Sequence, residues 1–236
     1  MKTVGIVGGM GPEATVDLFE KIIHNTKVNR DQDHIRVVID SNPEIPDRTS
    51  FILGMGPDPR PAMITGARHV EAIGAEIIAI PCNTAHFFYA DIQRAVHVQV
   101  LHMMRLVAAH LKGRVGHVGL LATTGTLRTG LYEAALREIG VDTLVPDGQG
   151  QERVMQAIYQ GVKAGRLEPA RVAILPEAAA LVARGAEAVI AGCTEVPLVL
   201  HTGDVPVEVV DATDILAKAC VQAAGGALRE TAPARG

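Results

Sequence analysis

Short apolar runs alternate along the chain with longer segments in which apolar residues recur every three or four positions. The apolar runs predict β-strands at about 4–7, 35–39, 76–80, 98–100, 115–121, 141–145, 188–191 and 207–210. The periodic segments predict helices at about 13–27, 126–139, 150–164, 169–184 and 213–224, with two more ending near residues 73 and 111. The proline-rich stretch 41–61 predicts a loop, and the small, polar residues 225–236 predict a frayed end. Strands that alternate with helices indicate an α/β fold, with mostly parallel β-sheets flanked by helices.

The same pattern occurs twice. The segments 4–11 and 118–125 match with an offset of 114 residues, Cys82 and Cys193 with one of 111, and Arg48 and Lys163 with one of 115. Three landmarks in the same order at nearly one spacing predict two pseudo-symmetric lobes, with the active site in the cleft between them. We expect one lobe to contain 1–98 together with the returning segment 208–236, and the other to contain 99–207.

Composition narrows the class of protein. The 236 residues are 48% hydrophobic and 20% charged, as in globular enzymes, and the formal net charge is only −4. With 3% aromatic residues and no basic run, nucleic acid is not an expected partner. No apolar stretch approaches the roughly 18 residues of a membrane span, so we expect no membrane partner and a cytoplasmic location. The three cysteines are widely spaced and form no Cys-x-x-Cys pair, which favours free thiols.

Two of the cysteines occupy matching positions. Cys82 follows the apolar run 75–80, Cys193 follows the run 188–191, and small hydroxyl or amide residues come after each. At the carboxyl end of a parallel strand, a thiol lies where open α/β sheets bind their ligands. A helix N-terminus beyond it would favour thiolate over thiol. Two thiols in matching loops therefore indicate one chemistry, in which one thiol removes a proton from a carbon and the other returns a proton on the opposite side.

Other features of the chain favour simpler interpretations. The Gly-Met-Gly-x-x-Ala sequence at 9–14 matches a dinucleotide fingerprint, but the acid after the second strand, Asp40, lies 31 residues on instead of about 20. We interpret this turn as one whose backbone N–H groups approach a substrate carboxylate. Cys220 lies within an alanine-rich helix and is expected in the core. The nine histidines show no metal-ligand spacing and no lysine sits in a recognisable pyridoxal-phosphate setting, so we expect no metal and no cofactor.

Four motifs follow one another in a fixed order. They are Gly-Gly-Met-Gly-Pro-Glu-Ala-Thr at 8–15, Ile-Pro-Asp-Arg-Thr at 45–49, Pro-Cys-Asn-Thr-Ala-His at 81–86 and Gly-Cys-Thr-Glu at 192–195. Together they resemble the aspartate racemase branch of the aspartate/glutamate racemase family, over residues 3 to about 215. The resemblance implies a cofactor-independent amino-acid racemase with two pseudo-symmetric lobes, usually a homodimer, in which Cys82 and Cys193 are the acid and base. Some members replace the first cysteine with threonine, whereas this chain has both.

The repeat and the resemblance also indicate which residues bind substrate. Arg48 and Lys163 are expected to bind the distal carboxylate of an acidic amino acid, which a guanidinium can hold through two hydrogen bonds. The other expected substrate-binding residues are Met10, Asn83, Thr84, Thr123, Thr124, Gly125, Thr126, Thr194 and Glu195. Asp47 and Glu195 would orient the thiols, bind the substrate ammonium or cap loops. His86 would either assist proton transfer or begin a helix.

The sequence leaves two alternatives to an aspartate racemase open. Hydantoin racemases and maleate isomerases share the two cysteines, but they need no pair of cations for a distal carboxylate. A non-catalytic protein that binds an acidic amino acid would not need two thiols. The sequence does not distinguish aspartate from glutamate or from a broader range of substrates.

Overall fold

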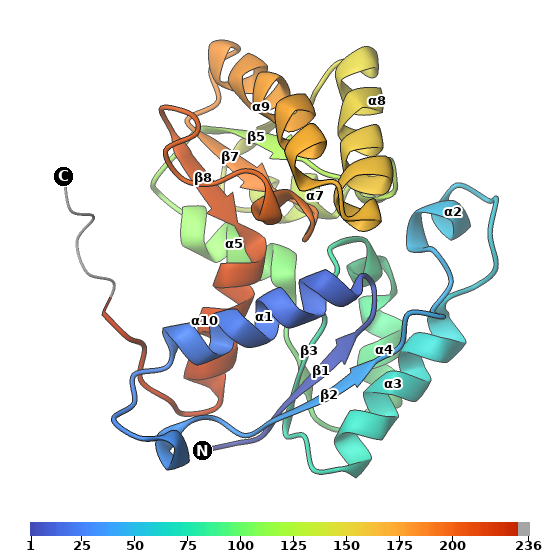
Figure 1. Ribbon diagram of the computed structural model, residues 1–236, viewed down its shortest axis with the longest axis vertical. Helices are drawn as coiled ribbons and strands as arrows, with labels where there is room; N and C mark the ends of the chain where they lie inside the picture. Colours follow the sequence, from blue (N-terminus) through green and yellow to red (C-terminus); the bar gives the residue numbers. More distant parts are fainter. Residues whose placement is uncertain (231–236) are drawn as a thin grey trace.

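The computed structural model describes residues 1–230, which form two four-stranded parallel sheets (Figure 1). The first sheet has the order β2-β1-β3-β4, with β1 (Val4–Gly8), β2 (Val37–Ser41), β3 (Ile77–Ala79) and β4 (Gln99–Val100). The second has the order β6-β5-β7-β8, with β5 (His117–Leu121), β6 (Asp142–Leu144), β7 (Ala188–Ala191) and β8 (Glu208–Asp211). The two orders are equivalent when the strands are numbered within each half, so the repeat in the sequence is a repeat in the structure. The predicted two-lobed α/β fold is confirmed.

Helices flank both sheets (Figure 1). The α-helices are α1 (Pro12–Asn25), α2 (Arg48–Ile52), α3 (Arg60–Ala72), α4 (Tyr89–Ala95), α5 (Met103–Leu111), α6 (Thr124–Thr129), α7 (Leu131–Arg137), α8 (Gly148–Gln156), α9 (Leu167–Ala183) and α10 (Ala212–Ala223). Short 3₁₀ helices span Asp31–Asp33, Thr84–Phe88, Val162–Ala164 and Val196–Leu198, and one π-helical turn spans Ala157–Gly161.

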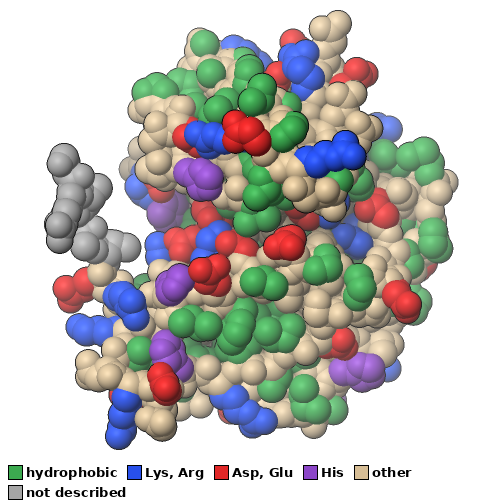
Figure 2. Space-filling view, viewed as in Figure 1, with side chains coloured by type: hydrophobic (Ala, Val, Ile, Leu, Met, Phe, Trp, Pro, Cys, Tyr) green, Lys and Arg blue, Asp and Glu red, His purple; other side chains and the backbone are tan. Residues whose placement is uncertain are grey.

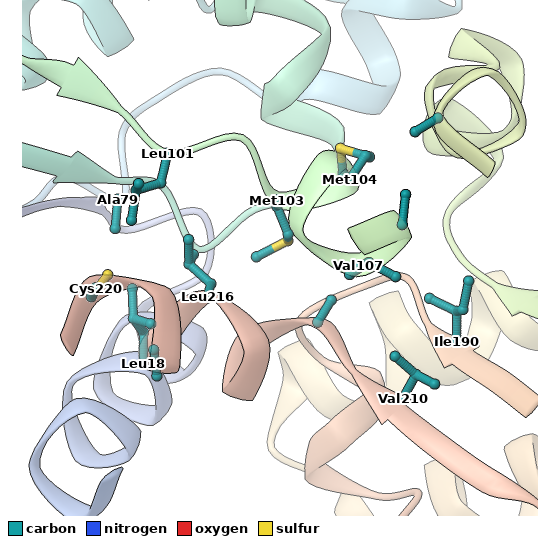
Figure 3. Close-up of a cluster of buried hydrophobic side chains, with 14 of the residues drawn as sticks. Leu18, Ala79, Leu101, Met103, Met104, Val107, Ile190, Val210, Leu216 and Cys220 are labelled. Carbon is teal, nitrogen blue, oxygen red and sulfur yellow. The ribbon is translucent and has the colours of Figure 1, made fainter. Parts of the chain in front are cut away.

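The two halves share one hydrophobic core. It extends from Ala79 of β3 to Ile190 of β7, with α5 and α10 between them, and α10 also packs on α1 (Figures 1 and 3). Met103 and Leu216 are fully buried in this core. Cys220 lies in it as well, completely buried, as its alanine-rich setting predicted.

The strand pairing places both boundaries between the halves a few residues from the predicted ones. Residues 99–100 form β4 and pair with β3, so the first half continues past the predicted boundary at 98. Residues 208–211 form β8 and pair with β7, so this segment belongs to the second sheet and not to the first half. The apolar Val209 and Val210 make β8 a good partner for the buried β7. The chain returns toward the first half only with α10, which packs on α1.

Local chemistry explains three other differences from the predicted elements. The helix expected at 126–139 is two helices, because Gly130 adopts a left-handed conformation with φ of 63°. The loop expected at 41–61 contains α2, whose first turn is capped by the Asp47 carboxylate accepting from Ser50 N–H. The helix expected at 150–164 changes at residue 157 from α to π and then to 3₁₀ geometry.

The predicted frayed end is wrong for residues 225–230 and lies outside the described residues from 231 onward. Leu228 forms an antiparallel bridge with Thr26, and the Arg229 N–H donates to the Asn25 carbonyl at 2.8 Å. These contacts tie the end of the described chain to the end of α1.

Charged side chains gather along the seam between the two halves on the face that carries α1 (Figure 2). Lys21 of α1 forms ion pairs with Asp17 of the same helix and with Asp211 of β8, each at 2.6 Å. Within residues 1–230, no helix combines the length and apolar character needed to cross a bilayer. The same residues contain no cluster of three or more His, Cys, Asp or Glu side chains suited to a metal ion.

Candidate active site

Cys82 and Cys193 come together at one cavity between the two halves. Cys82 follows β3 and Cys193 follows β7, the equivalent strands of the two sheets. Both thiols are buried, with 5% and 6% of each residue exposed. They line the same cavity of about 10 Å³, which is room for about one water molecule. The matching positions read from the sequence therefore correspond to one shared site.

The helical segments after the two cysteines differ in length. After Cys82, the 3₁₀ helix Thr84–Phe88 continues directly into α4 (Tyr89–Ala95), so a helix N-terminus does follow this thiol as predicted. After Cys193, the 3₁₀ helix Val196–Leu198 has three residues, and so short a helix aligns few peptide dipoles. The field expected from a helix N-terminus is therefore weak at Cys193.

Cys193 faces a carboxylate. Its thiol donates to Glu195 Oε2 at 2.9 Å, and Glu195 Oε1 forms an ion pair with Lys163. Burial and the Glu195 charge raise the pKa of Cys193 well above its usual range, against the opposing effect of Lys163. Cys193 is therefore a protonated thiol at neutral pH in this arrangement. Burial disfavours the charged form of Lys163, but the Glu195 charge outweighs burial and raises the pKa of the Lys163 ammonium. The Lys163 side chain is 25% exposed.

Cys82 faces a guanidinium. Arg48, which is 8% exposed, lines the same cavity as the Cys82 thiol. Burial disfavours the charge of Arg48, but its interactions with Cys82 and Asp47 outweigh burial and raise the pKa of the guanidinium. Its terminal nitrogens donate to the backbone carbonyls of Ile45, Pro46 and Met10, at 3.2, 3.1 and 3.0 Å. Arg48 is thus fixed by the backbone, and much of the donor capacity expected to hold a distal carboxylate is already used.

Two buried donors on the cavity wall lack a hydrogen-bond partner among the described residues. They are Arg48 Nε and Asn83 Nδ2. Asn83 is 2% exposed, and its Oδ1 accepts a hydrogen bond from the Tyr132 hydroxyl at 2.6 Å. Leaving a buried donor unpaired costs about 1–3 kcal/mol. Two such donors, on residues that line the thiol cavity, are therefore suited to an anionic ligand such as a carboxylate.

Hydroxyl groups from both halves connect the loops around the cavity. Thr84 and Thr123 line the cavity, and their hydroxyls are 3.1 Å apart. The Thr194 hydroxyl donates to the Pro81 carbonyl at 3.3 Å, which joins the two cysteine loops directly. Met10 lines the cavity too, and its carbonyl accepts from Arg48.

Three residues predicted to bind substrate do not line this cavity. Because α6 begins at Thr124, successive residues point to different sides of the helix. Thr124 faces α8, where its hydroxyl accepts from Gln151 at 3.3 Å. Gly125 packs against α2, and a Cβ there would lie 2.6 Å from Thr49 Oγ1. Thr126 lies behind the wall, where its hydroxyl is 2.8 Å from that of Thr84.

The glycine turn, Asp47 and His86 make contacts within the protein. The Gly9 N–H, one of those expected to approach a substrate carboxylate, donates to Thr15 Oγ1 at 2.9 Å. Asp47 caps α2 and accepts from the Tyr159 hydroxyl at 3.0 Å. His86 Nδ1 is 2.9 Å from the Cys82 carbonyl oxygen, and burial lowers the pKa of this imidazole. A neutral His86 that contacts the Cys82 backbone fits the prediction of a residue that begins a helix.

Sequence reasoning missed Tyr132, Tyr159 and Thr49. Tyr159 and Thr49 line the cavity, and Tyr132 contacts Asn83 from behind it. Tyr159 lies in the π-helical turn, and such turns are common near functional sites. No sequence motif indicated this turn. A wider cavity of about 360 Å³, lined in part by Glu13, adjoins the thiol cavity. The two cavities share the wall residues Met10, Asp47, Arg48, Lys163 and Glu195.

The chain is similar to known amino-acid racemases in sequence and in structure. The family model described as Asp/Glu/hydantoin racemase matches residues 7–220. The structure of the Picrophilus torridus aspartate racemase is similar, with a TM-score of 0.89 and 35% sequence identity, covering 97% of this chain and 96% of that one. An aspartate racemase homologue from Pyrococcus horikoshii OT3 has a TM-score of 0.76 and 29% identity, covering 95% of this chain and all of that one.

The chain is also similar to racemases named for other substrates. The broad specificity amino-acid racemase of Bacillus subtilis is 27% identical over 226 residues, which cover 92% of this chain and 96% of the relative. A glutamate racemase from Francisella tularensis, with a TM-score of 0.67 and 15% identity, shares the fold.

Proposed function

The chain belongs to the Asp/Glu/hydantoin racemase family and is an isomerase of the racemase type, and on this premise we propose that it racemises aspartate with two thiols and no cofactor. The observation that carries the proposal is that Cys82 and Cys193 line one cavity together with two cations and two unpaired donors. The aspartate racemase of Picrophilus torridus, at 35% identity over 97% of this chain, favours aspartate as the substrate.

The two thiols would carry the proton transfer. A thiolate removes the α-proton of the substrate, and the thiol on the opposite side donates its proton to the resulting carbanion-like centre. In the resting protein we assign the base to Cys82, because a guanidinium faces it, and the acid to Cys193, because its proton is held by Glu195. After one turnover the assignments are reversed, which the opposite enantiomer requires.

The neighbouring donors and charges would hold the substrate. Arg48 Nε and Asn83 Nδ2 are free to donate to a carboxylate, and Lys163 supplies a second positive charge for a dicarboxylic amino acid. Glu195 offers a carboxylate to the substrate ammonium when Lys163 turns to the substrate. Because the thiol cavity holds about one water, the cleft must widen to admit aspartate. The contacts that would yield are those of Tyr159 with Asp47 and of Thr49 with Thr123.

The proposal is tested by NMR in D2O with L- and D-aspartate and a panel of neutral and acidic amino acids. We expect α-deuteration and racemisation of aspartate by the untreated protein, and activity that survives EDTA and hydroxylamine. Cys82→Ala and Cys193→Ala should each abolish racemisation, since each removes one half of the acid–base pair. Cys220→Ala is the matched control and should remain active, because this thiol lies in the core. Racemisation by either single variant at the normal rate would refute the two-thiol mechanism.

The same panel separates an aspartate racemase from a broad-specificity enzyme, because the latter would deuterate neutral amino acids at comparable rates. The expected homodimer is a separate proposal, and analytical ultracentrifugation of the purified protein tests it.

A further inference from the structure

Tyr132 links the second half of the molecule to a cavity residue of the first half. It lies in the first turn of α7, is completely buried, and donates to Asn83 Oδ1 at 2.6 Å. Burial raises the pKa of this phenol far above its usual range, so the hydroxyl keeps its proton and acts as a donor. Among the described residues, Asn83 supplies its one hydrogen-bond partner. A buried hydroxyl proton needs an acceptor, and here the acceptor is the amide oxygen.

This bond determines which way the Asn83 amide points. An asparagine amide has an acceptor oxygen on one side and a donor NH2 on the other. With the oxygen held by Tyr132, the NH2 is on the opposite side of the amide and has no hydrogen-bond partner among residues 1–230. Asn83 itself lines the thiol cavity. If the amide rotated by half a turn, the cavity would receive a carbonyl oxygen instead. A carbonyl oxygen repels a substrate carboxylate, whereas an NH2 group binds it.

We propose that Tyr132 is a positioning residue, which orients the Asn83 amide so that its NH2 donates to a carboxylate of the amino-acid substrate. The proposal rests on the proposed racemase function for the identity of that ligand. Because Tyr132 and Asn83 belong to different halves, the bond exists only when the halves meet as they do here.

Tyr132→Phe tests the proposal, because it removes the hydroxyl and keeps the ring that fills the core. Losing a hydrogen bond to a charged group typically weakens binding about tenfold or more, so KM for aspartate should rise about tenfold while kcat changes less than about threefold. In an Asn83→Ala background, the same substitution should change KM less than about twofold, because Tyr132 acts through Asn83. Tyr89→Phe is the matched control, since the Tyr89 hydroxyl donates to the Val100 carbonyl and lies outside the cavity wall. It should leave KM unchanged.

A binding measurement separates this inference from the proposed function. In ¹⁵N-labelled protein, the Asn83 side-chain NH2 signal, assigned by its loss in Asn83→Ala, should shift when aspartate is added. Tyr132→Phe should need about tenfold more aspartate for the same shift. A shift without racemisation would refute the proposed function and leave the positioning role intact. No shift in the wild-type protein, an unchanged KM in Tyr132→Phe, or effects of the two substitutions that simply add would overturn the positioning role. If Tyr132→Phe does not fold, the absence of a shift in the wild-type titration would still overturn the positioning role.

Discussion

Glu195→Gln removes the negative charge that faces the Cys193 thiol and keeps the size of the side chain. Two unit charges 4 Å apart interact by about 4 kcal/mol at an effective dielectric constant of ~20. At 1.36 kcal/mol per unit, this repulsion raises a thiol pKa by about three units. Cys193 Sγ and Glu195 Oε2 are 2.9 Å apart, but Lys163 pairs with the other oxygen and cancels much of the repulsion. About half of this repulsion remains, and its loss lowers the pKa of Cys193 in the variant.

The consequence is a more reactive Cys193 at neutral pH. Far below a raised pKa, each unit of decrease multiplies the thiolate fraction about tenfold. The intrinsic nucleophilicity of the thiolate falls at the same time, with a Brønsted coefficient of about 0.4–0.5. Together these effects predict alkylation of Cys193 by iodoacetamide about three to ten times faster than in the wild type.

Mass spectrometry can follow the alkylation of each cysteine separately. The measured quantity is the rate at Cys193 divided by the rate at Cys82, because opening of the cleft affects both thiols and cancels in the ratio. Glu13→Gln is the matched control: it removes the same charge from the wall of the wider cavity and contacts neither thiol. In the wild type the alkylation rate of Cys193 itself should rise with pH, as the raised pKa of this thiol is approached from below. An unchanged or lower ratio in Glu195→Gln would show that Glu195 does not hold the Cys193 proton.

Two further substitutions test how the cleft is packed and held shut. Gly125→Ala places a Cβ 2.6 Å from Thr49 Oγ1 and should lower the free energy of unfolding by about 1–3 kcal/mol in urea titrations. Gly148→Ala places its Cβ in open space and should leave the free energy of unfolding almost unchanged. Equal losses of stability in the two variants would contradict the packing argument. Tyr159→Phe removes the hydrogen bond to Asp47, should cost about 1 kcal/mol of stability and should speed alkylation of both thiols. Thiol reactivity that matches the wild type would mean that this contact does not keep the cleft closed.

The parts of the molecule that could be predicted from the sequence are those encoded by adjacent residues. Apolar runs located the strands, and the matched positions of Cys82 and Cys193 indicated one shared site, because the ends of equivalent parallel strands face the same cleft. The break at Gly130 was also locally encoded, since a glycine within a helical pattern signals a possible end. Contacts between residues far apart were not accessible in this way. Tyr132 is 49 residues from Asn83 along the chain, and Tyr159 is 112 residues from Asp47. The residues next to either tyrosine do not indicate its hydrogen-bond partner.

The prediction for Arg48 was incomplete for a related reason. Arg48 in one repeat and Lys163 at the matching position of the other suggested that the two cations bind a carboxylate. The Arg48 side chain does reach the thiol cavity. The sequence could not show that the backbone carbonyls of Met10, Ile45 and Pro46 would take up its terminal nitrogens. Those acceptors exist only because the loops after β1 and β2 meet at this point, which is a property of the fold.

The repeated fold and the unequal charges would make separate contributions to the proposed two-thiol reaction. Duplication of the sheet brings two cysteines to one cavity in equivalent positions. Two thiols in identical surroundings would tend to share one protonation state, whereas proton transfer through a carbon needs one thiolate and one thiol. The charges around the thiols break that symmetry, because Arg48 faces Cys82 and Glu195 holds the proton of Cys193. Lys163 pairs with Glu195 and limits how strongly that proton is held, so in the proposed reaction Cys193 would still be able to lose it when the opposite enantiomer requires a base.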